Sequence, residues 1–317
     1  MIRNKPSFSN SWDPMKKTGP VCVIMLVAFL TTNLFAGEIH CLKRNNVAIF
    51  FAPSLETAAE EVAELYPGVK SQLEKALGWD LNLTPSVLLF KNTEKFHEIA
   101  ESPLTVAFAV PAKNLIAIDL TRINIRPFTL ENTLKHELCH LLLHHHIKEP
   151  VLPRWLDEGV CQWLSDGIGD IIMDQKHSFL NKAALSRRFI PLKALESSFP
   201  LRDRPLTLAY EESKSFVTYM TSQFGRQGIL NILELMKEGY DTDTAVLRAL
   251  NTTTRDLEIK WHDSLKSRIT WFMHVSTHLY DILFALMGLL SLLAFIRLLI
   301  KKRTLKDDEM DETDFVA

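Results

Sequence analysis

The sequence lacks a basic block, an internal repeat and a strong excess of either charge. Its 317 residues include 36 Lys and Arg against 38 Asp and Glu, which gives a formal net charge of −2 at pH 7. A nucleic-acid-binding domain normally carries a basic patch, so no nucleic-acid partner is expected. A chain of this length can bury a sizeable core in one or two domains.

Apolar residues are instead concentrated near the two ends of the chain. Near the N-terminus, the run Val21–Leu30 follows two lysines and is too short to span a bilayer comfortably. The small residue Ala36 follows this run, so residues 1–37 are predicted to be a secretory signal peptide or, alternatively, an uncleaved signal anchor. Because Met15 would itself be a suitable start, residues 1–14 could be an upstream extension.

The apolar segment near the C-terminus is long enough to cross a membrane. Residues 282–296 contain no charge, three apolar residues extend the segment past Arg297 to Ile300, and Lys-Lys-Arg follows at 301–303. Basic residues that flank a span stay on the cytoplasmic side. We therefore expect a transmembrane helix over 279–300, an exported domain before it on the periplasmic or extracellular side, and an acidic, disordered cytoplasmic tail over 301–317. A buried core helix is the alternative.

Cysteine is scarce, with four residues in the chain. Removal of the N-terminal segment would leave Cys41, Cys139 and Cys161, and this odd number leaves at least one thiol unpaired within the chain. Cys139 and Cys161 lie beside candidate metal ligands, so a disulfide between them is conceivable. Packing of both as small core residues is the preferred interpretation.

The middle of the chain divides into two regions with different periodicity. Short apolar runs and a hairpin predict a mixed α/β lobe over 38–126, whereas helical spacing predicts a helical lobe over 127–275. The expected strands are Val47–Phe51, Val87–Phe90, Val106–Val110 and Leu115–Ile118. The expected helices are 54–77 with a break or kink at Pro67-Gly68, 93–100, 129–147, 153–165, 207–223, 227–238, 242–250 and 254–273.

The stretch KHELCHLLLHHH, at residues 135–146, contains five of the eleven histidines. Its leucines form an apolar stripe that predicts an amphipathic helix. His136 and His140 are four residues apart and therefore lie on one face, within reach of one metal ion. This spacing is typical of zinc peptidases, and Glu137 is placed to take a proton from water. The alternative is a surface helix with two histidines and a chance glutamate.

Two residues compete for the role of third ligand. His146 lies where the longer motif His-Glu-x-x-His-x-x-Gly-x-x-His of the metzincins carries its third histidine. That motif turns sharply at its glycine, and this chain has Leu143 at the same position. A leucine continues the helix, which would carry His146 away from the metal.

Glu158 is the other candidate and lies eighteen residues beyond His140. Pro150 ends one predicted helix and Pro153 starts the next, so a helix–loop–helix can bring Glu158 back over the histidines. Gly159 is expected to let these two helices approach closely.

The motifs in this part of the chain resemble those of a known group of proteins. HELCH followed by PRWLDEG is similar to the gluzincins and most closely to the family called peptidase MA-like, and AYEESKSFVTYM at 209–220 is similar to a Tyr-bearing helix of that family. The resemblance covers roughly residues 45–265. It implies an α+β fold with a thermolysin-like zincin core, and Zn²⁺ held by His136, His140 and Glu158.

The resemblance also implies a zinc metallopeptidase that cleaves peptide bonds with a zinc-bound water. Glu137 would be the general base, and Tyr210 is expected to donate a hydrogen bond to the oxyanion. Thermolysin-type enzymes carry an aspartate four residues after the glutamate ligand, and here Gln162 is expected to orient an imidazole through its amide oxygen. An extended peptide is expected to pair with strand 106–110 or strand 115–118.

Two other functions fit the same residues. One is a non-catalytic, zinc-containing module that binds peptides or acts as a chaperone, although such a module has no need of a base at Glu137. The other is a zinc hydrolase that acts on a non-peptide amide of the cell wall, since the chemistry of activated water is similar for any amide. The expected partners are a peptide or protein substrate and the membrane bilayer, and the sequence does not indicate an oligomeric state.

Overall fold

The fold is taken from a computed structural model, which describes residues 38–100, 102, 104–123, 129–148, 150–165, 178–277 and 283–298. These residues belong to two compact units. One contains the described residues up to Leu180 together with 190–258, and the other contains 181–189 and the described residues from Ile259 onward. Every predicted site residue lies in the first unit, which is a mixed α+β structure with a small sheet and a majority of helices.

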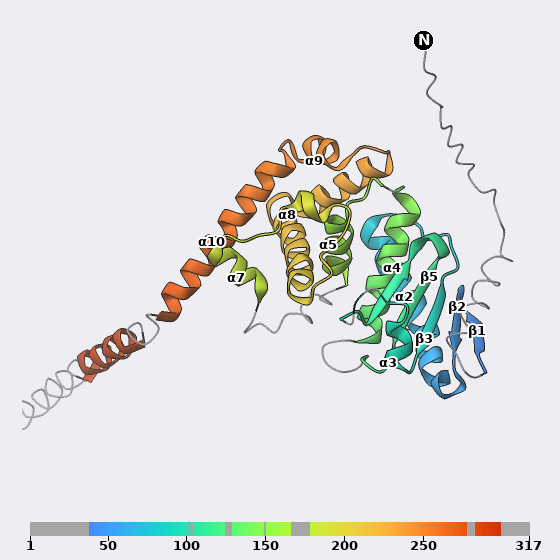
Figure 1. Ribbon diagram of the computed structural model, residues 1–317. Coiled ribbons are helices and arrows are strands. Elements are labelled where there is room, and N and C mark those ends of the chain that lie inside the picture. Colours follow the sequence, from blue (N-terminus) through green and yellow to red (C-terminus); the bar gives the residue numbers. More distant parts are fainter. Residues whose placement is uncertain are drawn as a thin grey trace, which may run out of the picture. The chain divides into compact units, whose positions relative to one another are not determined.

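Five strands form one mixed sheet in the order β1-β2-β3-β5-β4 (Figure 1). Strand β3 is central and pairs in parallel with both β2 and β5, whereas β1 and β4 pair antiparallel to their neighbours at the two edges. The strands are β1 His40–Arg44, β2 Val47–Phe51, β3 Ser86–Phe90, β4 Ala107–Val110 and β5 Leu115–Asp119. The four predicted strands and the predicted hairpin are therefore confirmed.

Strand β1 was not predicted, although its turn carries a recognisable signal. Asn45 and Asn46 join β1 to β2 and have φ angles of 53° and 64°. Two consecutive residues in the left-handed region form the tight turns that match the twist of a hairpin, and asparagine tolerates this region better than most residues.

Alternation along the strands gives the sheet two buried faces. Ile49, Val87 and Ile116 are fully buried on one face, where α2 contacts β2 and α4 contacts β4. On the opposite face, Leu88 and Phe90 form a cluster with Phe96 of α3. Helix α4, which carries the histidine motif, is thus held between the sheet and the rest of the first unit (Figure 1).

The remaining helices follow the predicted pattern closely. They are α2 Glu56–Leu77, α3 Thr93–His97, α4 Leu130–His146, α5 Arg154–Leu164, α7 Phe179–Ser186, α8 Asp203–Lys237, α9 Thr242–Leu250 and α10 Thr254–Thr277, with short 3-10 turns at Pro53–Leu55, Pro111–Lys113 and Leu192–Leu195. Helix α8 is interrupted at Gly225, which has φ 69° and ψ 176° and separates the two helices expected there. Helix α2 continues through Pro67, so of the expected break or kink the break is excluded, and α7 was not predicted.

The predicted terminal segments lie largely outside the described residues. This applies to residues 1–37, to the tail 301–317 and to both ends of the predicted membrane helix, whose middle, 283–298, is helical and solvent-exposed. Within the ranges that the structure describes, no helix has both the length and the apolar character needed to cross a membrane.

Candidate metal centre

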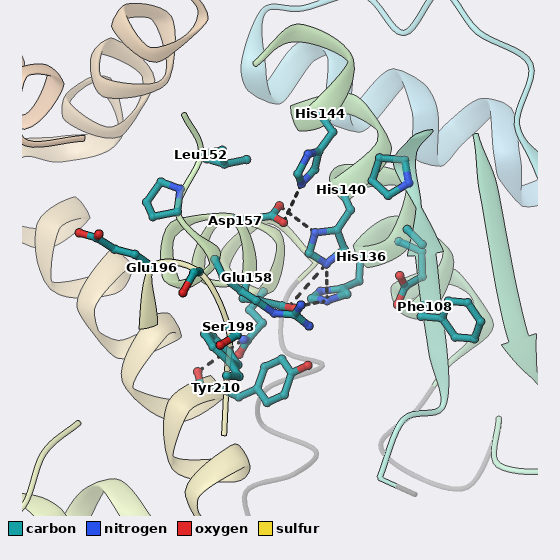
Figure 2. A pocket seen from close by; sticks show the side chains of 18 of the residues that line it. Phe108, His136, His140, His144, Leu152, Asp157, Glu158, Glu196, Ser198 and Tyr210 are labelled. Carbon is teal, nitrogen blue, oxygen red and sulfur yellow. Dashed lines mark hydrogen bonds and ion pairs between the residues drawn. The ribbon is translucent and has the colours of Figure 1, made fainter. Parts of the chain in front are cut away.

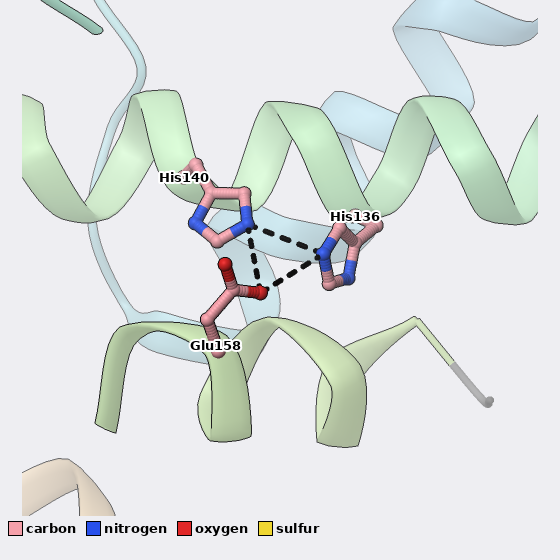
Figure 3. A group of neighbouring side chains, drawn as sticks. All are labelled: His136, His140 and Glu158. Carbon is pink, nitrogen blue, oxygen red and sulfur yellow. Dashed lines mark hydrogen bonds and ion pairs between the residues drawn. The ribbon is translucent and has the colours of Figure 1, made fainter. Parts of the chain in front are cut away.

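Helix α4 presents His136 and His140 on one buried face. Thr129 caps its start, because the side-chain oxygen accepts the N–H of Asn132 at 3.2 Å, and the helix then continues to His146. The two imidazoles are 6% and 8% exposed, and their Nε2 atoms lie 3.2 Å apart (Figure 3). The four-residue spacing therefore brings two ring nitrogens to one point.

Helix α5 brings a carboxylate to the same point. Pro153 precedes its first residue, and Glu158 follows one turn later. The Oε2 atom of Glu158 lies 3.6 Å from Nε2 of His136 and 3.6 Å from Nε2 of His140 (Figure 3). The two helices thus place the three predicted ligands together.

The donors of this group fit a zinc ion. Oε2 of Glu158 is buried and has no hydrogen-bond partner among the described residues. A buried carboxylate oxygen without a donor is costly, so the site favours a cation facing this atom. Two imidazole nitrogens and one carboxylate oxygen form a set of three ligands that zinc accepts, with a further coordination position left open.

Asp157 orients His140 and was not singled out in the sequence. Its Oδ1 lies 2.8 Å from Nδ1 of His140, and its Oδ2 lies 3.0 Å from Nε2 of His144 (Figure 2). Because a carboxylate accepts, Nδ1–H of His140 donates, which leaves Nε2 available to a metal. Burial opposes a charged imidazole, yet Asp157 and Glu158 raise the pKa of His140 to about 10. The site therefore favours a positive charge at this position.

Glu137 is buried beside the three predicted ligands. Only 5% of it is exposed, and it lines the same cleft as His136 and His140. Burial raises its pKa, the two histidines oppose this effect, and the charges of Glu158 and Asp157 add to it. A carboxylate with a raised pKa binds a proton more readily than an exposed one.

The partners of His136 and Gln162 differ from those expected. Nδ1 of His136 lies 3.5 Å from the hydroxyl of Ser165, a contact that the sequence did not indicate. Gln162 does not orient an imidazole: its amide N–H donates to the backbone oxygen of Tyr210 at 3.4 Å, and its Oε1 has no hydrogen-bond partner within the described part of the chain. That expectation was wrong, because Asp157 already occupies the free nitrogen of His140.

Tyr210 lies on α8 and lines the cleft near the three ligands (Figure 2). Its ring packs edge-on against Phe199, with centroids 5.1 Å apart. Burial and the charge of Glu158 raise its pKa, and Arg154 opposes this through its charge and a hydrogen bond. The guanidinium of Arg154 also lies 3.7 Å from Oε1 of Glu158. The Tyr210 hydroxyl thus keeps its proton and can act as a donor.

His146 lies apart from this group. Its Nε2 donates to the backbone oxygen of Asp80 at 2.8 Å, and its ring centroid lies 5.0 Å from that of Trp79. Leu143 is buried within the continuous helix α4, as expected. The side chain of His146 therefore joins the end of α4 to the segment that follows α2.

Gly159 allows a close helix contact, but with a different partner from the one expected. A Cβ atom at this position would lie 2.6 Å from the backbone oxygen of Ser213 and 2.6 Å from a methyl group of Val217. Both residues belong to α8. The glycine therefore sets the approach of α5 to α8 and not to α4.

A disulfide joins α4 to α5. Cys139 and Cys161 are bonded, both are fully buried, and their Cα atoms lie 5.4 Å apart. The preferred interpretation of two unpaired core cysteines was wrong, because the crossing of the helices brings the two side chains together beside the ligands. Cys41 remains as an exposed free thiol.

The metal centre opens into a cleft of about 1300 Å³. One wall is strand β4, and the opposite side includes the Pro150–Pro153 segment, the 196–201 loop and the start of α9. Strand β5 is paired on both sides, whereas β4 is the edge of the sheet. Of the two strands considered for substrate pairing, only β4 is therefore placed to receive an extended chain.

The comparison with protein families covers the part of the chain that contains this metal centre. A family model described as the Peptidase MA superfamily matches residues 72–267. None of the curated proteins matches the chain.

Several solved structures match part of the chain. Aminopeptidase A of Legionella pneumophila in complex with aspartic acid is 12% identical, with 71% of this chain and 27% of that chain covered and a TM-score of 0.43. An M1 zinc metallopeptidase from Deinococcus radiodurans is 14% identical, with 72% and 51% covered and a TM-score of 0.37. A functionally unknown conserved protein from Bacillus anthracis is 13% identical, with 80% and 55% covered and a TM-score of 0.41. The chain spans between about a quarter and about half of these proteins.

Proposed function

The chain belongs to the peptidase MA superfamily, and on that premise we propose that it is a zinc-dependent metallopeptidase of the gluzincin type. One observation carries the proposal. The buried Oε2 of Glu158, which has no hydrogen-bond donor among the described residues, meets the Nε2 atoms of His136 and His140 at 3.6 Å. These three residues would hold the zinc ion.

Glu137 would act as the general base. A zinc ion bound beside it would supply Lewis-acid chemistry, which makes water more acidic and polarises a carbonyl group. The raised pKa of Glu137 suits a carboxylate that accepts the proton of the attacking water. Glu137 then returns that proton to the nitrogen of the leaving amine. Its burial beside the ligands favours an enzyme over a module that only binds peptides.

Tyr210 would donate a hydrogen bond to the carbonyl oxygen as negative charge develops there. Its position in the cleft and the raised pKa of its hydroxyl support this role. Arg154 contacts both Tyr210 and Glu158 and would hold the Tyr210 hydroxyl by a hydrogen bond and Glu158 by charge.

The proposed substrate is a peptide in an extended conformation. Within the described residues β4 is the edge of the sheet; it lines the cleft and presents backbone groups that can pair with a substrate strand. A cleft of about 1300 Å³ is large enough to hold a segment of polypeptide. Pairing with backbone groups is independent of side chains, so specificity would come from the pockets around β4 and the 196–201 loop.

The proposed location is a membrane, with the catalytic domain exported and the tail over 301–317 in the cytoplasm. The uncharged run at 282–296, the Lys-Lys-Arg that follows and the exposure of 283–298 support an anchor. The Cys139–Cys161 disulfide supports an oxidising compartment. A protease-protection assay at residue 270 tests this topology, and protection opposite to that expected would refute it.

The full-length chain, purified in detergent, allows a direct test of the activity. We expect zinc to bind close to one per chain, and peptide libraries to be cleaved only when zinc is present. A chelator should abolish cleavage and added zinc should restore it. A second library consists of cell-wall cross-links. Cleavage confined to this second library would change the substrate class, and a zinc-loaded chain that cleaves neither library would refute the proposal.

A further inference from the structure

A second group of possible metal ligands lies on the other side of His140. It consists of Nδ1 of His140, Oδ1 of Asp157 and Sγ of Cys161, which all lie within 4.8 Å of one another. Oδ1 of Asp157 is 2.8 Å from the imidazole nitrogen and 3.9 Å from the sulfur. Ligand atoms around a tetrahedral zinc ion are on the order of 3–4 Å apart, so small movements would make this a nitrogen, oxygen and sulfur site.

The two groups share one imidazole but use opposite nitrogens. The first group uses Nε2 of His140, which faces His136 and Glu158, whereas the second uses Nδ1. A neutral imidazole carries one proton, so only one of its nitrogens has a lone pair for a metal. A metal at Nδ1 would place the proton on Nε2 and remove His140 from the first group. The two groups therefore exclude each other.

The disulfide withholds the sulfur that the second group needs. While Cys161 is bonded to Cys139, its Sγ cannot become a thiolate, and thiolate is the form that binds zinc. We propose that the Cys139–Cys161 disulfide decides which nitrogen of His140 binds the metal. With the disulfide closed the metal is held through Nε2, and with the disulfide open it is held through Nδ1, Asp157 and Cys161.

Conversion of the closed form to the open form requires a two-electron reductant, such as a dithiol or a phosphine. A dithiol becomes a disulfide, and its two electrons and two protons convert both cysteines to thiols. Metal binding then releases the thiol proton of Cys161 and leaves the imidazole proton on Nε2. Both cysteines are fully buried, so the folded protein resists reduction of the disulfide. The open form is therefore the form of the chain before its cysteines are first oxidised.

The consequence for catalysis rests on the proposed function. A newly made chain in a reducing compartment would hold zinc in the second group, where the first set of ligands is incomplete. Oxidation would close the disulfide and transfer the metal to the first group. The peptidase would thus be inactive until it reaches an oxidising compartment.

Three variants of the full-length chain separate this effect from the loss of a cross-link. All carry Cys22→Ser and Cys41→Ser, which leaves Cys139 and Cys161 as the remaining cysteines of the chain. The first has no other change, the second adds Cys139→Ala and so frees Cys161, and the third adds Cys139→Ala and Cys161→Ala. The second and third both lack the disulfide, so any difference between them reports on the sulfur of Cys161 alone.

Cobalt(II) is the probe, because a cobalt–thiolate bond gives an intense near-ultraviolet absorption. We expect this band in the second variant only, and peptide hydrolysis in that variant at least tenfold below the third. X-ray absorption spectroscopy at the zinc edge should show a sulfur atom at about 2.3 Å from the zinc in the same variant. A second variant without a sulfur ligand would overturn the inference.

Two further outcomes are informative. If the second and third variants do not fold, the first variant is used instead. It is folded with its disulfide closed, and the disulfide is then reduced with a phosphine in mild denaturant. The absence of the cobalt–thiolate band once two thiols have been titrated would equally overturn the inference. If the first variant binds zinc without cleaving peptides while the second shows the band, the proposed function fails and the second metal site stands.

Discussion

Helices α4 and α5 meet at one site but are supported by different parts of the first unit. Helix α4 lies against α2 and the edge strand β4, and its two histidines are set by the local spacing of one helix. Helix α5 packs against α8 through Gly159, and the position of Glu158 depends on that packing. Chemistry carried by α4 should therefore tolerate changes in the fold better than chemistry carried by α5.

The largest expected effect is a loss of peptide hydrolysis, caused by a change on α4 that leaves metal binding intact. Glu137→Gln removes the proposed base but none of the three ligands. Loss of a general base typically costs about 10²–10⁴-fold in rate, so peptide hydrolysis should fall within this range. Zinc content, measured by elemental analysis, should stay unchanged. A variant with full activity would disprove the mechanism, and a variant without zinc would show that Glu137 is itself a ligand.

The matching change on α5 should act on the metal first. Glu158→Gln removes the only charged member of the ligand set, so zinc affinity should fall by at least about 100-fold and activity should fall with it. Competition with a coloured chelator gives the affinity. Glu131→Gln, an exposed change in the first turn of α4, is the control and should have no effect. Zinc bound equally well by both variants would exclude Glu158 as a ligand.

The support of α5 can be tested without touching a ligand. Gly159→Ala places a methyl group 2.6 Å from the backbone of α8, and this overpacking should lower the free energy of unfolding by about 2–3 kcal/mol. Gly68→Ala lies within α2, where nothing approaches within 4 Å, and should instead stabilise the protein by about 0.5–1 kcal/mol. Urea unfolding of both variants gives the comparison. Equal stabilities would mean that α5 does not depend on its contact with α8.

The free energy of unfolding should depend on pH through a carboxylate on α8. Glu212 on α8 accepts the N–H of Ile190, and burial raises its pKa to about 8 from an ordinary 4.5. Between these pH values the folded state holds a proton that the unfolded chain releases, so stability decreases as pH rises from about 4.5 to about 8.

Glu212→Gln removes this titration and keeps an oxygen for Ile190. The variant should be more stable than the wild type at pH 8 by about 1–3 kcal/mol, and the difference should shrink at pH 5. Glu60→Gln, an exposed change on α2, is the control. A constant difference between pH 5 and pH 8 would contradict the prediction.

The smallest expected effect concerns the end of α4. His146→Ala removes the hydrogen bond to Asp80 and should cost about 1 kcal/mol of stability. Zinc content and activity should remain those of the wild type, because His146 lies apart from the ligand group. Loss of zinc in this variant would favour the metzincin arrangement over the gluzincin arrangement.

The same contrast explains what could be predicted from the sequence. His136, Glu137 and His140 are fixed by their spacing on one helix, and the structure brings them together as expected. The sequence also predicted Glu158 as the third ligand, because a recognisable segment surrounds it, and the structure places it 3.6 Å from both histidines. The strands were predicted from short apolar runs, but their order places β3 between β2 and β5, which depends on crossover connections that local patterns do not specify.

The partners of the ligands could not be predicted. Asp157 and Gln162 both have side chains able to orient an imidazole, and the choice between them depends on how α5 is rotated against α4. Ser165 and the Cys139–Cys161 pair depend on the same rotation. The close partner of Gly159 is α8, whose contact residues lie more than fifty positions later in the chain. Sequence spacing carries no information about such distances.

The free edge of β4 has a consequence for the behaviour of the protein in solution. Backbone groups that can pair with a substrate can also pair with the same strand of another copy, since hydrogen bonding between strands does not distinguish partners. The strand consists of four apolar residues without a charge, and Pro111 follows it directly and limits the length of such pairing. At high concentration, association between copies should therefore compete with substrate for β4, so the specific activity should decrease as the enzyme is concentrated.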